Sequence, residues 1–330
     1  MVTTESKRKD NRNNTQINVK YTDDEINIPD KNLKKALKKY IHKIQDYDIT
    51  KDRLEEIEYL SLSNMKITNL EGLQYCKNLI ELDVSINKLT DIKPLANLKK
   101  LKSLDLYDNK IIDIKPLESL YNLEYISLSC NRINSIKPLR SLENLAYLAL
   151  GENRLNDIQD LKDLTNLRSL FLSYNTINNI EVLEELKNLN WIGLDDNRIC
   201  DISALGKIED LSNIHIHNNK VILEKKEIVH DKLVVKNPLK DIKGMPIIPS
   251  EVSNDGFYNE EENTLIWDKS LDNLNRVEFK FDNSYFSGSV IVPIKNVVIK
   301  PKEIEEKLEE EGKFASKVSN TLNFIKKVFN

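Results

Sequence analysis

Two histidines, His215 and His217, are separated by one residue, and Asp195 lies one 22-residue interval before His217. On an extended strand, residues i and i+2 share a face about 7 Å apart, so both imidazoles and the carboxylate could approach one metal ion. That separation is wide for a shared ion, and no group is in place to orient the ligands. We therefore expect surface histidines, with no metal and no cofactor.

Aromatic side chains recur at positions that alternate with regularly spaced Leu and Ile residues. They are Tyr107, Tyr125, Tyr147, Phe171, Tyr174 and Trp191. Acidic residues accompany them, namely Glu81, Asp83, Asp105, Asp108, Glu152, Asp195 and Asp196. Exposed aromatic clusters with polar rims mark interaction sites, and Tyr and Trp dominate binding hot spots. The alternative is that aromatic residues are simply favoured in strands.

Composition excludes several other classes of function. The 330 residues include only 8 glycines, and no glycine-rich phosphate loop, G-x-S-x-G or H-E-x-x-H motif occurs, so we expect no enzymatic activity. The formal net charge of -4 predicts no binding of nucleic acid. No apolar run approaches the length of a membrane span. The 3 cysteines are too few and too far apart in the sequence to predict a disulfide framework or a zinc site. We also expect the protein to be a monomer.

A strict 22-residue repeat organises the middle of the chain. Asparagines mark it at Asn87, Asn109, Asn131, Asn153, Asn175, Asn197 and Asn219. Apolar residues stand five and three positions before each Asn and two positions after it, as Leu104, Leu106 and Ile111 do around Asn109. This is the leucine-rich-repeat pattern L-x-x-L-x-L-x-x-N-x-L. An earlier unit carries Met65 where Asn is expected, which gives eight units in all.

The pattern predicts a curved solenoid with a parallel sheet. In each L-x-L segment the two apolar side chains share one strand face, which points into the coil. The Asn amide is expected to satisfy buried backbone groups at the turn. The remaining apolar residues form a return path of short 3₁₀ turns on the convex side, with Pro94, Pro116 and Pro138 at helical starts. The side chains between core positions then face outward on the concave surface.

Both ends of the solenoid are predicted to be capped. Asp30 and Thr50 are expected to begin two amphipathic helices in a cap spanning residues 26–57, after a disordered tail over residues 1–25. The repeats occupy 58–229. Residues 230–296 predict short strands packed as a small β-sandwich, with Trp267 in its core, and residues 297–330 predict a helical tail.

A second set of charged residues follows the Asn of each repeat. The basic members are Lys88, Lys110, Arg132, Arg154, Arg198 and Lys220, and the acidic members three residues later are Asp91, Asp113, Asp157 and Asp201. Because the signs alternate, a solvated rim whose charges offset one another is favoured over a patch for an acidic partner.

The chain resembles the internalin family of bacterial surface and secreted proteins. The segments that carry the resemblance are the opening Ile26 to Leu37, the repeat N-x-I-x-D-I-x-P-L at Asn109 to Leu117, Lys236 to Asp241 with Gly244, Asn254-Asp255-Gly256-x-Tyr258, Asn263-Thr264-x-x-Trp267 and Phe286-Ser287-Gly288. The resemblance covers residues 26 to 294. It implies that residues 230–296 form an Ig-like domain and that the concave sheet binds a protein partner such as a host-cell surface protein.

The resemblance also implies a secreted or surface location. The sequence holds no signal peptide and no L-P-x-T-G-like anchor, which leaves a cytoplasmic location as the alternative. The 22-residue unit also resembles the leucine-rich regulatory subunit of protein phosphatase, so an intracellular regulatory scaffold is the second hypothesis. On the first hypothesis, partner-binding residues are Tyr107, Tyr125, Tyr147, Phe171, Tyr174, Trp191, Asp195, His215 and His217.

Overall fold

The computed structural model describes residues 26–41, 48–268, 271 and 274–295, and two strands nearer the N-terminus. Those strands, β1 (Ser6–Lys9) and β2 (Gln16–Val19), pair antiparallel within the segment predicted to be disordered. Such a pair needs only local backbone hydrogen bonds and no core, so composition does not reveal it. The rest of residues 1–25 and the predicted helical tail, 297–330, lie outside the described residues.

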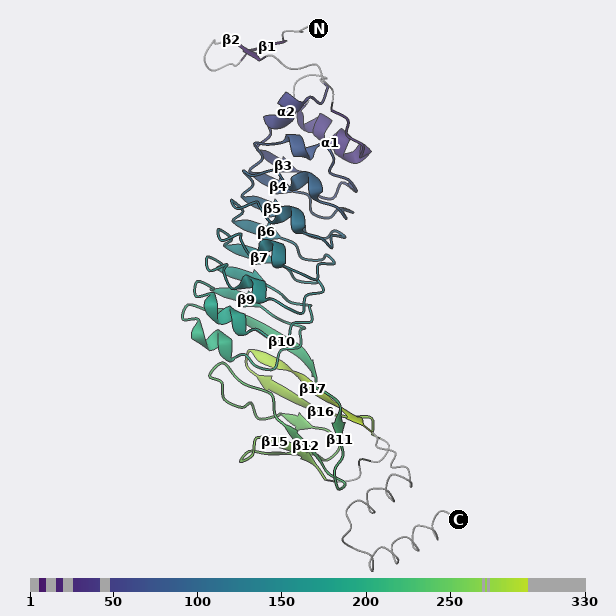
Figure 1. Cartoon of the computed structure of the whole chain (residues 1–330), viewed down its shortest axis with the longest axis vertical. Coiled ribbons are helices and arrows are strands. Elements are labelled where there is room, and N and C mark those ends of the chain that lie inside the picture. The colour runs from purple at the N-terminus through teal and green to yellow at the C-terminus, as the bar shows by residue number, and fades with distance from the viewer. Residues whose placement is uncertain are drawn as a thin grey trace, which may run out of the picture.

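One parallel sheet runs along the repeats, as predicted (Figure 1). Its strands are β3 (Tyr59–Ser61), β4 (Glu81–Asp83), β5 (Ser103–Asp105), β6 (Tyr125–Ser127), β7 (Tyr147–Ala149), β8 (Ser169–Phe171), β9 (Trp191–Gly193) and β10 (Asn213–Ile222). Each residue pairs with the one 22 positions later, as Leu60 does with Leu82 and Leu82 with Leu104. The 22-residue period of the sequence therefore equals the offset at which neighbouring strands pair.

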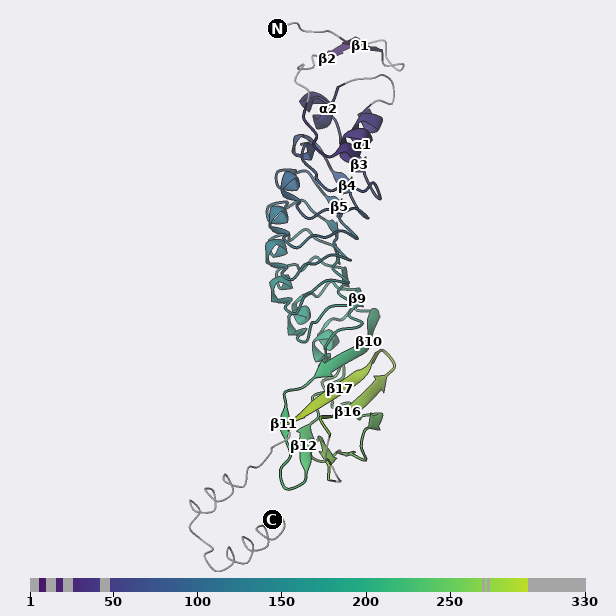
Figure 2. The same cartoon turned by 90° about the vertical axis from the view of Figure 1, so that its right-hand side faces the viewer.

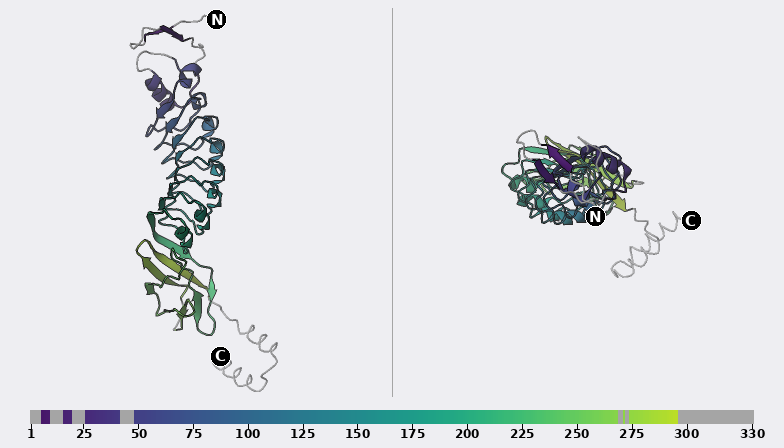
Figure 3. Two further views of the ribbon diagram at one scale, coloured as in Figure 1. Left: turned by 90° about the vertical axis from the view of Figure 1, so that its left-hand side faces the viewer. Right: turned by 90° about the horizontal axis from the view of Figure 1, so that it is seen from above.

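The return path is made of short 3₁₀ turns, also as predicted. They are η1 (Leu73–Tyr75), η2 (Lys93–Leu95), η3 (Lys115–Leu117), η4 (Lys137–Leu139), η5 (Gln159–Leu161), η6 (Glu181–Glu185) and η7 (Ser203–Lys207). Pro94, Pro116 and Pro138 lie in the first turn, where a missing N–H is tolerated. Figures 2 and 3 show these turns along one edge, which bows outward, while the sheet lines the opposite, concave side.

The interior is filled by the aliphatic residues of the repeat. In the unit around β5 the core residues are at most 1% exposed: Leu104, Leu106, Ile111, Ile114, Leu117, Leu120 and Leu123. The corresponding residues of the other units belong to the same continuous apolar cluster. A single unit cannot bury this many side chains alone, so each repeat depends on its neighbours for its core.

A ladder of buried asparagine side chains locks the repeats together. The amide nitrogen of Asn109 donates to the carbonyl oxygens of Leu106 at 3.2 Å and Tyr107 at 3.3 Å in its own turn, and to Val84 O at 3.1 Å in the preceding repeat. Its Oδ1 accepts from Leu89 N at 3.0 Å. One side chain thus satisfies backbone groups of two adjacent units, and the same bonds recur at Asn131, Asn175 and Asn197.

A second asparagine ladder lies nearer the surface. Asn78, Asn122, Asn144, Asn166 and Asn188 each donate one side-chain bond to the carbonyl oxygen 23 residues earlier. Asn144, for example, donates to Tyr121 O at 2.8 Å. These side chains are more exposed, so water can replace the bond more easily than in the buried ladder.

The N-terminal cap covers the open end of the first repeat. Helix α1 (Lys31–Ile41) buries Leu33 and Leu37, and α2 (Lys51–Glu55) buries Leu54. Asp30 is the N-cap of α1, as predicted: its Oδ1 accepts from Asn32 N at 2.9 Å and Leu33 N at 3.0 Å. Its Oδ2 accepts from the backbone N–H and the hydroxyl of Thr68, so the same carboxylate fastens the cap to the repeat.

The prediction that Thr50 caps a second helix is correct in position but wrong about the capping hydrogen bond. Thr50 does precede α2, but its side chain makes no capping hydrogen bond, and its hydroxyl is buried without a partner in the described part of the chain. Thr50 is nearly fully buried, which keeps its hydroxyl away from water. Close packing at Gly72 marks the junction between the cap and the first repeat: a Cβ there would lie 2.0 Å from the Cδ1 of Ile28, and its φ is 110°.

The C-terminal region continues the solenoid sheet. Strand β17 (Phe286–Lys295) pairs parallel with β10 and antiparallel with β16 (Arg276–Asn283), which also pairs with β13 (Glu251–Val252). Strand β11 (Lys226–Glu227) pairs with β17. A Cβ at Gly288 would lie 1.9 Å from Asn219 O, so glycine is required where the two parts meet. Short strands are present within residues 230–296, as the sequence predicts.

A separate antiparallel sheet contains β12 (Leu233–Lys236), β15 (Thr264–Trp267) and β14 (Phe257–Asn259). Trp267, 1% exposed, lies in the core as predicted and donates through Nε1 to Ser253 O at 2.7 Å. Inward residues of both sheets join the apolar cluster of the solenoid. The domain boundary proposed near residue 230 stays a prediction, because one continuous sheet crosses it.

Replacing Asn131 with Ala should lower the free energy of unfolding by about 2–4 kcal/mol, because buried carbonyl groups in two repeats lose their donor. Asn144→Ala is the matched control: it removes one exposed bond and should cost less than about 1 kcal/mol. Guanidinium unfolding followed by circular dichroism measures both. Equal losses for the two variants would contradict the role assigned to the buried ladder.

Asp30→Asn should destabilise the protein by about 1–2 kcal/mol at pH 7. Burial raises the pKa of Asp30, but hydrogen bonds from Thr68, Leu33 and Asn32 outweigh it and hold the pKa below its ordinary value. A group with a depressed folded pKa stabilises the fold above its unfolded pKa, about 4, and loses that contribution as the pH falls through the folded value.

Urea unfolding across pH 2–7 is therefore expected to show the difference between wild type and Asp30→Asn shrinking below about pH 4. The control Asp163→Asn, at an exposed carboxylate, should change stability by less than about 0.5 kcal/mol. A difference for Asp30→Asn that does not depend on pH would remove the carboxylate from the explanation.

Candidate functional site

Four positions per repeat face the concave side, and they form four columns across the sheet. The first column is Tyr59, Glu81, Ser103, Tyr125, Tyr147, Ser169, Trp191 and Asn213. The second is Ser61, Asp83, Asp105, Ser127, Ala149, Phe171, Gly193 and His215. The third is Ser63, Ser85, Tyr107, Ser129, Gly151, Ser173, Asp195 and His217. The fourth is Asn64, Ile86, Asp108, Cys130, Glu152, Tyr174, Asp196 and Asn218, all with φ between 49° and 59°.

Five of the predicted site residues form a continuous ladder of rings. Tyr125 and Tyr147 stack with centroids 4.4 Å apart and planes 13° apart. The Phe171 ring lies 5.4 Å from Tyr147 and 6.1 Å from Trp191, in tilted arrangements. Trp191 in turn stacks with the His215 imidazole at 6.1 Å. We call these five residues the ring ladder; it crosses β6 to β10 without interruption.

The ring ladder lies outside the coil. The core positions beside it are filled by Leu148, Leu150 and their equivalents, which are 0% exposed. Trp191 is 41% exposed, whereas Tyr125, Tyr147 and Phe171 are half-buried against one another. Tyr107 and Tyr174, at 40% and 57% exposed, stand beside the ladder on the turns that follow the strands. The rings therefore present a joined apolar surface to whatever enters the concave side.

The phenols of this surface lie in a negative electrostatic environment. Burial, Tyr147 and the charge of Asp105 raise the pKa of Tyr125 to about 12. The charge of Asp196 is the largest cause that raises the pKa of Tyr174, and Asp195 and Glu152 add to it. These phenols stay protonated and uncharged at neutral pH.

Tyr107 shows the same direction with a different leading cause. Its hydrogen bond with Cys130 raises the pKa of Tyr107 most, followed by burial and the charges of Asp108 and Glu152. Cys130 was not predicted as a site residue. The fourth column could have indicated it, because Cys130 occupies the place held by Asp108 and Glu152 in the repeats on either side.

The histidine pair does not assemble a metal site. His215 stacks on Trp191, whereas His217 Nδ1 lies 3.3 Å from the hydroxyl of Ser287. Asp195 is engaged by the backbone, since its Oδ1 accepts from His217 N at 2.7 Å. Among the residues that the structure describes, no group of three His, Cys, Asp or Glu side chains is placed to hold an ion.

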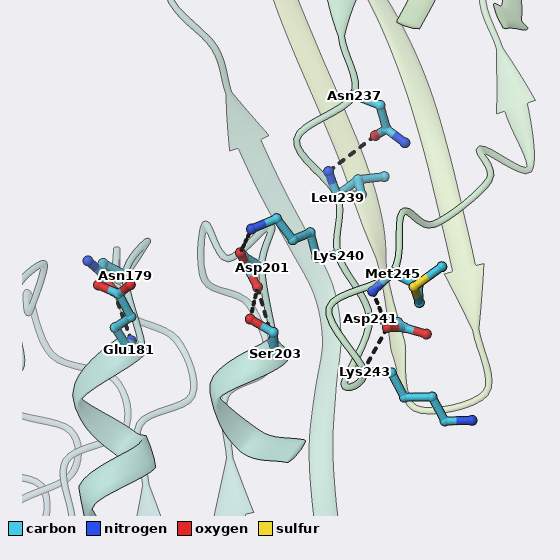
Figure 4. Close-up of polar contacts among 10 residues, drawn as sticks. All are labelled: Asn179, Glu181, Asp201, Ser203, Asn237, Leu239, Lys240, Asp241, Lys243 and Met245. Atoms are coloured by element: carbon cyan, nitrogen blue, oxygen red, sulfur yellow. Dashed lines mark hydrogen bonds and ion pairs between the residues drawn. The ribbon is translucent and has the colours of Figure 1, made fainter. Parts of the chain in front are cut away.

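The acidic residues of the rim have a structural use. Asp91, Asp113, Asp157 and Asp201 each accept a hydrogen bond from the backbone N–H two residues later, in the turn that leads into a 3₁₀ segment. Figure 4 shows this turn at Asn179 and Asp201, and again at Asn237 and Asp241 beyond the solenoid. Lys240 also donates to Asp201 Oδ2 at 2.6 Å, which ties the two parts together.

Two exposed residues of the concave face were missed by the sequence patterns. Tyr59, 52% exposed, and Ile86, 43% exposed, occupy the first and fourth columns near the cap. Tyr59 lies in the repeat that carries Met65 in place of Asn, so the Asn series that marks the other repeats does not include its repeat. Aligning that repeat on Leu60 and Leu62 would have placed Tyr59 in the same column as Tyr125.

A separate hollow of about 680 Å³ lies between η3 and η4 on the flank. Tyr121 and Ile112, 57% and 53% exposed, contribute its apolar lining. The hollow is formed by residues of the return path and not by the four columns, so Tyr121 serves as a control aromatic residue.

In the described part of the chain, no helix is both long and apolar enough to cross a bilayer.

Comparison with protein families matches two models of the same kind. The model for leucine-rich repeats in two copies matches residues 55–97 and 99–141, and a leucine-rich-repeat model matches residues 121–175 and 143–199. These ranges contain strands β3 to β9 and the residues of the ring ladder up to Trp191. A search of curated proteins finds none that matches.

Solved structures similar to this chain include two from Listeria monocytogenes. An internalin C2 is 36% identical, with 56% of this chain and 91% of that chain covered and a TM-score of 0.47. An internalin F is 28% identical, with 58% and 70% covered and a TM-score of 0.46. The repeat ectodomain of the Arabidopsis thaliana receptor kinase GASSHO1/SCHENGEN3, in complex with Casparian strip integrity factor 2, is 25% identical, with 49% and 21% covered and a TM-score of 0.45.

The stacked pair at the start of the ring ladder should contribute measurable coupling. In a double-mutant cycle of Tyr125→Ala and Tyr147→Ala, urea unfolding is expected to give a coupling free energy of about 0.5–1.5 kcal/mol. Either single variant already removes the stacking contact, so the double variant cannot lose it a second time. Tyr59→Ala with Trp191→Ala is the control pair, six strands apart, and should be additive within about 0.5 kcal/mol. Additivity of the Tyr125 and Tyr147 variants would mean that the rings pack independently.

Proposed function

The chain is a leucine-rich-repeat protein, and from that premise we propose that the concave face of its sheet binds another protein. The observation that carries the proposal is the ring ladder of Tyr125, Tyr147, Phe171, Trp191 and His215, which lies outside a fully occupied core. Tyr107, Tyr174, Asp195 and His217 complete the proposed binding surface. The protein acts by recognition, without a catalytic step.

Physical reasons support this use of the surface. Five adjacent strands spaced about 4.8 Å apart give the ring ladder a length of about 19 Å. Tyr and Trp provide large contact areas with little loss of side-chain entropy, which is why they dominate binding hot spots. The rings also hold one another in place before a partner arrives, so less conformational freedom is lost on binding.

We infer further that the chain is an internalin-like protein whose two-sheet region is Ig-like. The order of a helical cap fastened by Asp30, a stack of 22-residue repeats and a β region joined through β17 supports this. So do the sequence segments around Asn237, Gly256 and Trp267. On this basis the partner is a surface protein of another cell, and the chain acts as a secreted or surface-displayed protein.

The test is partner capture by a variant that removes three rings. Tyr147→Ser/Phe171→Ser/Trp191→Ser should lose capture of the partner from host-cell extracts, identified by mass spectrometry, because the central apolar contact is gone. Its melting temperature should fall by only a few degrees, since the core beneath is unchanged. Tyr121→Ser, at the exposed ring on the flank, is the control and should capture as the wild type does. Undiminished capture by the triple variant would place the binding surface elsewhere.

A further inference from the structure

The concave face carries charge of one sign. Across the four columns on β3 to β10 there is no Lys and no Arg. The same columns hold seven carboxylates, which are Glu81, Asp83, Asp105, Asp108, Glu152, Asp195 and Asp196. With 49 Lys and Arg in a chain of formal net charge -4, cations are abundant elsewhere, so their absence from this surface is specific to it.

Within the described residues, none of these seven carboxylates forms an ion pair with Lys or Arg. Asp83 accepts instead from Ser85 N at 3.0 Å and from the hydroxyls of Ser61 and Ser85, and Asp105 accepts from Tyr107 N. Backbone N–H and hydroxyl donors hold these groups in place while leaving their negative charge uncompensated.

The arrangement works against the stability of the free protein. Asp83 on β4 and Asp105 on β5 are direct register partners, and like charges placed opposite each other destabilise a sheet. A local rule broken in this way, without compensation inside the protein, is characteristic of functional surfaces. The charge of Asp196 is the largest cause that raises the pKa of Tyr174, whereas for Tyr107 and Tyr125 the carboxylate charges add to larger causes, the hydrogen bond with Cys130 and burial respectively.

A row of charged residues borders this surface. The residue after the repeat Asn is basic in six of the seven Asn-containing repeats, with Thr176 as the exception: Lys88, Lys110, Arg132, Arg154, Arg198 and Lys220. Asp91, Asp113, Asp157 and Asp201 follow three residues later, so this row offsets much of its own charge and the uncompensated negative charge is confined to the four columns. The pattern restricts where along the partner its positive charges can lie, which gives orientation as well as attraction.

We infer that the partner inserts a positively charged, arginine-rich polypeptide segment into the concave face, an inference that rests on the proposed function. A guanidinium can stack on the ring ladder and pair with a carboxylate at the same time. Its flat face lies against a ring, whereas its N–H groups point outward in the plane and donate to the carboxylate. Lysine, a compact ammonium, matches only part of that combination. Trp191, with Asp195 and Asp196 on the same repeat, offers both kinds of contact.

The experiment titrates the full chain with three synthetic probes, nona-arginine, nona-lysine and nona-glutamate, by calorimetry at two salt concentrations. The variant Asp83→Asn/Asp105→Asn/Glu152→Gln removes three charges from the concave columns. Its matched control, Glu143→Gln/Asp163→Asn/Glu209→Gln, removes three exposed carboxylates outside the columns and so changes net charge equally.

Nona-arginine should bind the wild type and the control within about twofold of each other, and the concave variant about tenfold or more weakly. Binding should weaken with added salt, nona-lysine should bind several-fold less tightly than nona-arginine, and nona-glutamate should not bind. Equal loss in the two variants, or binding of nona-glutamate, overturns the inference. If nona-arginine does not bind while the triple-ring variant still loses partner capture, the concave face remains the binding surface and only the basic character of the partner is refuted.

Discussion

Everything in this fold depends on satisfying the backbone at the turn that follows each strand. A three-residue strand leaves the turn with carbonyl groups inside an apolar coil, where water cannot reach them. The buried Asn provides donors for those carbonyls and an acceptor for a backbone N–H of the previous repeat, as Asn109 does for Leu106, Val84 and Leu89. Since that side chain bridges two units, it fixes the spacing between them, and with it the register in which all outward-facing side chains are stacked.

This constraint explains how much of the fold the sequence predicts. The period, the core comb, the eight parallel strands and the 3₁₀ returns all follow from residues that repeat, because each copy reports the same environment. Departures from the period are also interpretable: the Asn amide reaches back to a preceding repeat, and the unit with Met65 has no preceding repeat to reach. Features made once are harder to predict. Thr50 stands where a capping residue is expected, but its hydroxyl is buried and makes no hydrogen bond to the start of the helix.

Some features of the candidate site can likewise be predicted from the sequence, and others cannot. That Tyr125, Tyr147 and Trp191 face outward follows from their alternation with core residues. The contacts that join them do not follow, because Phe171 and His215 belong to the second column and reach the first only through their ring orientations. The sequence pattern also could not predict the role of the acidic residues of the rim, because regularly spaced carboxylates can either hydrogen-bond to a turn of the chain or contact a partner. The turn bonds of Asp91 and Asp113 distinguish the two.

The pairing of β17 with β10 has a consequence for how such a molecule can change in length. Both ends of the stack are closed by contacts that no interior unit makes, at Asp30 and Thr68 on one side and at Gly288 and Asn219 on the other. Duplication of a 22-residue unit in the interior would leave both closures intact and insert one more row into the sheet. Growth at either terminus would have to break a closure first. The stack is therefore extensible from within, and its outward surface can lengthen one row at a time while its ends stay the same.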